Sequence, residues 1–150
     1  MLINVDPLLS PEILLTLRSM GHGDSLVLSD ANFPSYSHNS TLHRMDGLNI
    51  NQAAKAILSV FPLDSFIAEP VLRMEIDGKP EEINEVHQDL INTVKKISGD
   101  NWKVGSIERQ KFYAEAKKAF AVITTSDTRP YGCFIFIKGV LKPDGSVWIV

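Results

Sequence analysis

The sequence is poor in several features on which whole protein classes depend, beginning with cysteine. Its 150 residues include one cysteine, Cys133, so no disulfide can form within the chain. A lone thiol fits a reducing compartment. Lysine and arginine together number 15 against 18 acidic residues, which gives a net charge of −3. Because no basic surplus is available to neutralise several phosphates, nucleic-acid binding is not expected.

Long apolar runs are absent as well. No stretch reaches the roughly 18 apolar residues of a transmembrane helix, and neither end of the chain matches a lipidation motif. The N-terminus has no early Lys or Arg, and Asp6 interrupts its apolar run, which is unlike a secretory signal. The expected location is therefore the cytoplasm, with no membrane partner.

The composition that remains is that of an ordinary globular protein, with 44% hydrophobic and 22% charged residues. A domain takes about 100–200 residues, so residues 1–150 are expected to form one domain. A domain of this length buries roughly 68–70% of the surface that its unfolded chain exposes. It therefore needs neither a disulfide nor a metal ion to fold.

Helical and extended patterns alternate along the chain. Helices are predicted from Pro11 to a stop at Gly21, from Asn49 or Asn51 to Pro62, from Pro80 to Gly99, and over Arg109–Lys118. Strands are predicted over 25–29, 71–76, 102–107, 119–124 and 133–137, and residues 31–48 are polar and irregular. This alternation favours a three-layer α/β/α fold with a mostly parallel or mixed sheet.

His22 is the first candidate for chemistry. It lies between two glycines just beyond the first predicted helix, and the negative end of that helix favours a protonated imidazole. Histidine can both accept and donate a proton near neutral pH. The alternative is a surface histidine that only terminates the helix.

Asp30 is the second candidate, because it directly follows the strand 25–29, whose apolar centre predicts burial on both faces. The carboxyl ends of strands in open α/β sheets are where ligands bind, and a carboxylate there can accept hydrogen bonds from sugar hydroxyls. The alternative is that Asp30 caps the loop that follows, since aspartate is a favoured turn residue.

Arg109 and Tyr131 complete the set of candidates. Arg109 begins a short predicted helix, and Tyr131 precedes Gly132 and the last predicted strand. A phenol can both donate and accept a hydrogen bond. The alternatives are a solvated charge for Arg109 and an aromatic ring packed on a turn for Tyr131.

Other signals do not lead to a site. The residues His22, His38, His43 and Asp30 lack the spacing of known zinc motifs, so no metal is expected. Cys133 begins an apolar strand and is expected to be a buried small hydrophobe, and His87 is expected to be structural. No glycine pattern suits a phosphate loop or a dinucleotide turn.

Four segments together resemble the D-ribose pyranase / L-fucose mutarotase family. They are MGHGDSLVLSDANFP at 20–34, RMDGL at 44–48, FYAEAKKAF at 112–120 and YGCFIFIKGV at 131–140. The likeness runs from about Leu9 to Leu141. The phrase Asn32-Phe33-Pro34 and the segment FYAEAKKAF resemble the fucose branch more than the ribose branch. The tail 143–150 is poorly covered.

The resemblance implies an isomerase without a cofactor that interconverts the α and β anomers of a free monosaccharide, with L-fucose the expected substrate. By this likeness His22 is the catalytic histidine, and the substrate contacts fall on Asp30, Arg109, Tyr131, Gly132 and Cys133. The family usually has Asn where Cys133 stands, which alters the site only if that side chain touches the sugar. Ring-shaped oligomers, often decamers, with sites at subunit interfaces are also implied.

The chemistry of mutarotation suits these residues. One group removes the proton of the anomeric hydroxyl while another protonates the ring oxygen, and neither step needs a metal or a redox cofactor. We expect His22 to be the main acid and base, with Tyr131 as a second proton relay or as the group that orients the anomeric oxygen. Asp30 and Arg109 would hold ring hydroxyls.

Distance along the chain bears on how the site is built. Eight extended steps between His22 and Asp30 span up to about 26 Å, far more than a monosaccharide. Either the chain bends sharply around the strand, or different subunits contribute these residues to one site. Two alternative functions stay open, a D-ribose pyranase and a non-catalytic sugar-binding protein of the same fold.

Overall fold

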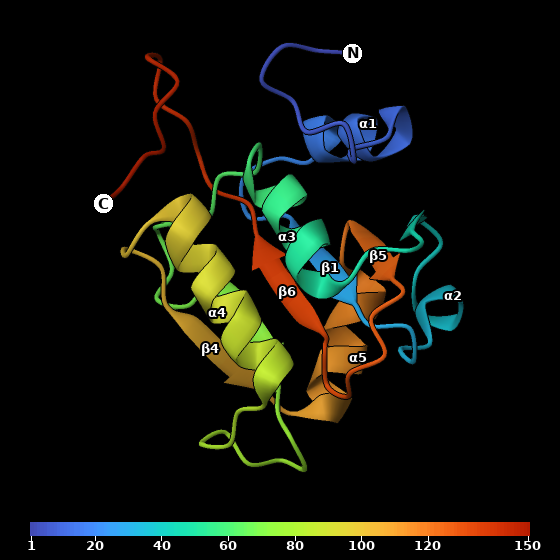
Figure 1. Cartoon of the computed structure of the whole chain (residues 1–150). Helices are drawn as coiled ribbons and strands as arrows, with labels where there is room; N and C mark the ends of the chain where they lie inside the picture. The colour runs from blue at the N-terminus through green and yellow to red at the C-terminus, as the bar shows by residue number, and fades with distance from the viewer.

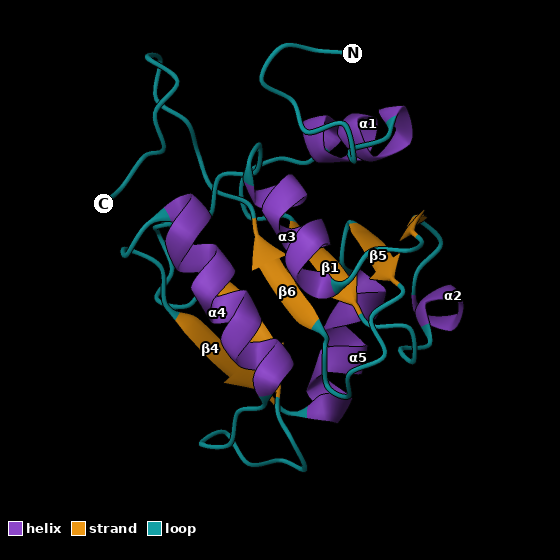
Figure 2. Ribbon diagram, in the orientation of Figure 1, coloured by secondary structure: helices purple, strands orange, loops and turns teal.

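The computed structural model describes residues 1–150 and contains a mixed six-stranded sheet (Figure 2). The strands are β1 (Ser25–Ser29), β2 (Leu42–Met45), β3 (Val71–Met74), β4 (Val104–Ile107), β5 (Ala121–Thr125) and β6 (Phe134–Ile137). Their order is β2-β5-β1-β6-β3-β4. Strand β6 is antiparallel to both of its neighbours, and the other pairs are parallel. The predicted α/β fold with a mixed sheet is confirmed.

The chain forms five helices, and helices lie on both faces of the sheet. The five are α1 (Pro11–Ser19), α2 (Ser35–His38), α3 (Ile50–Leu58), α4 (Glu85–Ser98) and α5 (Arg109–Lys118). Helices α3 and α4 cover the near face in Figure 1, and α5 lies behind the sheet. Along β1, Leu26 and Leu28 join the larger apolar core with α3 and α4, whereas Val27 joins the smaller core with α5. The strand is therefore buried on both faces, as its apolar centre predicts.

Helix α1 lies beyond one end of the sheet rather than on a face (Figure 1). The side chain of Ser10 caps its first turn by accepting a hydrogen bond from Ile13 N. The Lys138 ammonium donates to the carbonyls of Leu17 and Met20, both at 2.6 Å, and so binds the negative end of the helix. This end of the fold carries the turn that contains His22.

Helix α4 begins later than its sequence pattern predicts. The predicted start at Pro80 is wrong, because Asn84 accepts a hydrogen bond from His87 N and starts the helix at Glu85. The segment before it forms a tight turn at Asp77-Gly78, in which Lys79 N donates to Ile76 O. The apolar pattern had placed residues 80–84 in the helix, but they belong to a loop at the end of the sheet far from α1.

The segment 31–48 is more regular than predicted, since it contains α2 and the edge strand β2. Strand β2 pairs only with β5, and its residues Leu42 and His43 are half-buried. An edge strand with polar residues lacks the apolar alternation by which strands are found in a sequence. Strands β3 and β4 are also shorter than predicted, ending at Met74 and beginning at Val104. None of the helices is long and apolar enough to cross a membrane.

Candidate active site

The predicted site residues divide into two groups at opposite ends of β1. His22 lies in the turn before this strand, and Asp30 follows its last residue. A five-residue strand is about 17 Å long. The cavity of about 510 Å³ beside His22 shares no lining residue with the two clefts that contain Arg109 and Tyr131. The chain does not bend around the strand, so one copy holds the predicted residues in two separate groups, which we call half-sites.

At the first half-site, a tight turn presents His22. Gly21 N donates to the Asp24 carboxylate at 2.7 Å, and Gly23, with φ +85°, donates to Lys138 O at 2.9 Å. A left-handed φ of this kind suits glycine. The His22 side chain is 47% exposed, so its ring is open to a ligand. The left-handed turn thus gives a structural reason for the glycine at position 23.

The imidazole of His22 has a carboxylate partner that no sequence pattern indicated. Its Nε2 lies 3.1 Å from Oδ1 of Asp64, whose side chain is only 4% exposed. The same oxygen accepts a hydrogen bond from Phe66 N at 3.0 Å, which fixes the carboxylate. When Nε2–H donates to Asp64, Nδ1 is left with a lone pair that can accept a proton. A histidine oriented by a buried carboxylate is suited to acid–base chemistry.

Aromatic rings flank the histidine on one side. Phe66 lies with its ring centroid 5.2 Å from that of His22, and Trp148 lies 6.3 Å beyond Phe66. The C-terminal tail that carries Trp148 folds back here, because Ser65 Oγ donates to Trp148 O at 2.6 Å and accepts from Val150 N. Residues of the tail therefore border the His22 half-site.

At the second half-site, Asp30 is buried and its carboxylate is already engaged. Its Oδ1 accepts from the backbone N–H groups of Asn32 and Phe33, and its Oδ2 accepts from Gly132 N, each at 3.0 Å. Burial raises the pKa of Asp30, although these hydrogen bonds oppose the rise. The loop-capping alternative is confirmed, and the aspartate also ties the residue after Tyr131 to the end of β1. Direct contact of Asp30 with a sugar stays a prediction.

Tyr131 adopts a backbone conformation that few non-glycine residues do, with φ +60°. Its carbonyl accepts a 2.9 Å hydrogen bond from Nε2 of the fully buried His87, and the next N–H is bound by Asp30. Burial lowers the pKa of His87 to about 4, so the imidazole is neutral at pH 7. His87 is structural, as predicted, and its structural role is to hold Tyr131.

The phenol of Tyr131 donates a 2.7 Å hydrogen bond to Oδ1 of Asp77, in the turn before α4. This bond raises the pKa of Tyr131, and the phenol therefore keeps its proton near neutral pH. The sequence identified Asp77 only as a turn residue. Its part in this half-site follows from the fold, which brings the turn after β3 beside the loop before β6.

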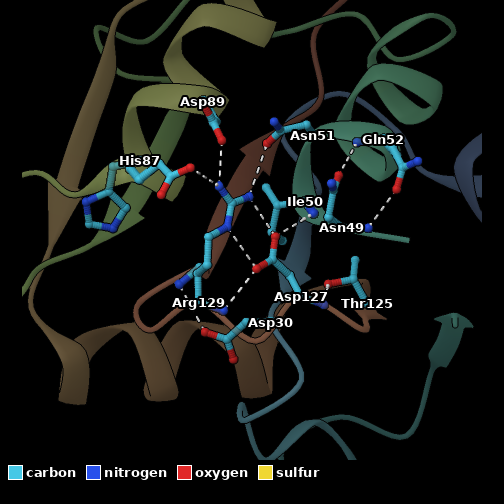
Figure 3. A network of polar contacts seen from close by, with 12 residues as sticks. Asp30, Asn49, Ile50, Asn51, Gln52, His87, Asp89, Thr125, Asp127 and Arg129 are labelled. Carbon is cyan, nitrogen blue, oxygen red and sulfur yellow. Dashed lines mark hydrogen bonds and ion pairs between the residues drawn. The ribbon is translucent and has the colours of Figure 1, made fainter. Parts of the chain in front are cut away.

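A network of ion pairs fixes the loop that leads to Tyr131 (Figure 3). Arg129 donates to Asp127 at 2.8 Å and to Asp89 of α4 at 2.6 Å. Asp127 also accepts from Ile50 N, the first residue of α3, at 3.0 Å. Burial alone would raise the pKa of Asp127, but the bonds from Arg129 and Ile50 outweigh it and lower that pKa. The loop is thereby bound to both helices of the near face.

Two adjoining clefts open beside Tyr131 and share it and Arg109 as lining residues. One has a volume of about 310 Å³ and is polar, and the other has a volume of about 270 Å³ and reaches Asp30. The exposed side chain of Arg109 borders both. Cys133 lines the second cleft but is only 2% exposed, and burial raises the pKa of its thiol. The predicted small-hydrophobe character of Cys133 agrees with this burial.

The histidines that could have formed a metal site have separate partners. His43 Nε2 lies 2.6 Å from the Thr16 hydroxyl, and His38 Nδ1 lies 2.8 Å from the carbonyl of Pro34. His22 is paired with Asp64 instead. These side chains therefore belong to three different local structures.

Comparison with known proteins assigns the chain to a family. A model of the RbsD / FucU transport protein family matches residues 3–141. The chain belongs to this family. The L-fucose mutarotase of Actinobacillus pleuropneumoniae serotype 5b (strain L20) is 38% identical over 140 residues, which cover 93% of this chain and 97% of that protein. Membership agrees with the resemblance found in the sequence.

Solved structures agree with this assignment. The crystal structure of protein Atu2016 superposes with a TM-score of 0.91 at 44% identity and covers 95% of this chain and 97% of its own. The fucose mutarotase of Streptococcus pneumoniae, solved in complex with L-fucose, gives a TM-score of 0.85 at 34% identity over 94% of this chain and 100% of its own. Both similarities extend over nearly the whole chain.

Proposed function

We propose that this protein is a cofactor-free mutarotase that interconverts the α and β anomers of L-fucose. Relatives named L-fucose mutarotase, 38% identical over 93% of the chain, support this substrate and reaction. The observation that carries the proposal is the pairing of His22 with the buried carboxylate of Asp64. This pair supplies an oriented imidazole with one free ring nitrogen, which is what a reversible proton transfer needs.

The two half-sites suit the two proton transfers of the reaction. Ring opening requires a base at the anomeric hydroxyl and an acid at the ring oxygen. His22 serves one position and Tyr131 the other. Arg109 and the backbone around Gly132 and Cys133 hold the sugar hydroxyls, with Asp30 as a further contact, and so fix the ring between the two groups. The bonds that break and form are between carbon, oxygen and hydrogen, without change of oxidation state.

Because β1 separates the half-sites within one chain, we propose that the complete site forms between two copies. His22 of one copy then faces Tyr131 of the next, and repetition of this contact closes a ring, with a decamer the expected size. Large apolar side chains exposed near the His22 end support such a contact: Met1, Leu2, Ile3, Leu15, Trp148 and Ile149. The buried free thiol of Cys133 is compatible with a reducing compartment, and we propose the cytoplasm.

NMR exchange between the anomers of L-fucose, with and without protein, tests the activity. We expect faster exchange with the wild type and a loss of roughly 10²–10⁴-fold in His22→Ala. D-ribose, followed between its pyranose and furanose forms, is the comparison sugar. Faster exchange of ribose alone would mean a pyranase, and saturable fucose binding without faster exchange would mean a binding protein. Equal rates for wild type and His22→Ala would remove His22 from the mechanism.

Mixing two inactive variants tests the shared site. In oligomers reassembled from His22→Ala and Tyr131→Phe subunits, some interfaces combine an intact His22 with an intact Tyr131. Recovery of up to about one quarter of the wild-type rate is expected from random mixing of equal amounts, as follows from the cyclic arrangement of interfaces. No recovery in verified mixed oligomers, or full activity in a dilute monomer, would contradict a site built from two copies.

A further inference from the structure

The hydrogen bond between Tyr131 and Asp77 joins two rigidly held groups. The Asp77-Gly78 turn has φ values of +48° and +72° and is closed by the bond from Lys79 N to Ile76 O, features of a two-residue type I′ turn. Opposite it, Tyr131 is fixed in a left-handed conformation through its own carbonyl and the N–H that follows. Only three non-glycine residues of the chain have positive φ, and two of them form this contact. Conformations of this kind concentrate at functional sites.

The direction of the bond decides what the phenol can do. Its only proton points at Oδ1 of Asp77, 2.7 Å away, so the phenol oxygen has lone pairs free but no free proton. A sugar hydroxyl in the cleft beside Tyr131 can therefore donate to the phenol but cannot accept from it. This polarity suits the base side of the reaction and not the acid side.

Charged groups of both signs surround Asp77. The cleft is lined by Glu75, after β3, and by Glu108 and Arg109, at the start of α5, and Lys79 lies on the turn itself. The negative charge of Asp77 favours the charged form of Lys79, and the positive charge of Arg109 acts on the phenol of Tyr131. Two cations, Lys79 and Arg109, and two carboxylates, Glu75 and Glu108, therefore share the surroundings of Asp77.

We propose that Asp77 is the terminal proton acceptor of the base side and acts through Tyr131. The proposal rests on the mutarotase function. As the anomeric O–H bond breaks, its proton forms a bond to the phenol oxygen, and the phenol proton passes to Oδ1 of Asp77. The electron pair of the anomeric O–H forms the carbonyl C=O. The bond from the anomeric carbon to the ring oxygen breaks, and the ring oxygen keeps that electron pair and takes a proton from the protonated His22 of the partner subunit.

Ring closure then runs the same steps in reverse. After rotation about the bond next to the aldehyde, neutral His22 of the partner subunit removes the proton of the chain hydroxyl, whose oxygen attacks the other face of the carbonyl. The new anomeric oxygen takes the proton of Tyr131, and Asp77 returns its proton to the phenol. All groups regain their starting protonation, so the cycle needs no co-reactant.

Asp77→Asn is the decisive variant, because Asn-Gly favours the same turn and the amide has nearly the shape of the carboxylate. We expect kcat for L-fucose anomer exchange to fall by roughly 10²-fold, with KM changed by less than about threefold. Asp77→Glu should have a kcat at least about tenfold higher than that of Asp77→Asn. In the Tyr131→Phe background, Asp77→Asn should add no further loss, since the two groups act in series. Asp144→Asn, in the Asp144-Gly145 turn at the other end of the fold, is the matched control.

The outcomes separate this inference from the function on which it rests. If the wild type does not accelerate exchange, the proposed function fails and the relay with it. If the wild type is active and Asp77→Asn keeps kcat within about threefold, the relay alone is overturned. A loss carried by KM, a loss that Asp77→Glu does not recover, or a loss that adds to that of Tyr131→Phe would likewise overturn it.

Discussion

Nε2 of His22 and Oδ1 of Asp64 lie 3.1 Å apart although the two residues are 42 positions apart in the sequence. The carboxylate is buried, while the imidazole is half-exposed beside a cavity. One side of the ring is thus fixed and the other is open. The pairing with Asp64 therefore fixes the orientation of His22, which a histidine between glycines in a flexible loop would lack.

Replacing the carboxylate of that pair should slow catalysis. In Asp64→Asn the amide can donate to Nε2, which favours the tautomer with the proton on Nδ1 and removes its free lone pair. We expect L-fucose anomer exchange to fall by roughly 10²-fold. Asp46→Asn, on the surface, should keep the wild-type rate. An Asp64→Asn protein that folds and exchanges anomers at the wild-type rate would show that Asp64 does not control the tautomer.

The buried His87 should make stability depend on pH below neutrality. Its folded pKa is about 4, against about 6.5 when unfolded. Between these values the unfolded chain binds more protons than the folded protein, so the free energy of unfolding falls as the pH falls. The stabilising contribution of neutral His87 is complete above pH 6.5 and is lost as the pH falls toward 4. The loss amounts to about 3 kcal/mol. Urea unfolding from pH 7 to 4 measures it, and His87→Gln should lose this dependence while His38→Gln keeps it.

Loss of Arg129 should destabilise the fold because it leaves the carboxylate of Asp127, 3% exposed, without its cation. Arg129→Met should lower the free energy of unfolding by about 3 kcal/mol. The exposed pair of Arg44 and Asp46 provides the comparison, since Arg44→Met should cause no measurable change. Urea titration of the three proteins at one pH is sufficient. Equal midpoints for Arg129→Met and wild type would contradict the importance of the network.

Gly132 should not tolerate a side chain. A Cβ there would lie 3.2 Å from Cβ of Asp30 and 3.3 Å from the carbonyl oxygen of Arg129. Gly132→Ala should cost about 1–3 kcal/mol of stability and displace Tyr131, slowing anomer exchange as well. In Gly21→Ala the nearest atom would be 3.7 Å away, so its stability should change much less. Thermal unfolding of both variants gives the comparison.

Cys133 should be unreactive in the folded protein. The residue is 2% exposed and its burial raises the pKa of the thiol, so little thiolate forms near neutral pH. Ellman's reagent should react at least about 100-fold more slowly with native protein than with protein unfolded in urea. Cys133→Ala gives the background signal. Rapid native reaction would mean that the side chain reaches the cleft, and hence a ligand.

Local patterns in the sequence determined most of the elements. Ser10 and Pro11 indicate where α1 begins, and α5 and β1 have the predicted bounds, because caps and apolar centres act over a few residues. The predicted start of α4 was wrong because the apolar stripe of the sequence continues through Ile83, which the structure leaves 47% exposed. The short edge strand β2 was missed because it carries little of the apolar periodicity that marks a buried strand.

The sequence by itself also identified His22, Asp30, Arg109 and Tyr131 as candidates, but it could not pair them. The order of the strands and the antiparallel insertion of β6 between β1 and β3 leave no periodic trace in the chain. Yet that order brings Asp77 to the phenol of Tyr131, 54 positions away, and the return of the chain after α3 brings Asp64 to His22. Neighbours in the sequence determined the local structure around each of these candidate residues. Their partners, and the separation of the two half-sites by the length of β1, were decided by the tertiary structure, because side-chain contacts depend on how distant segments pack.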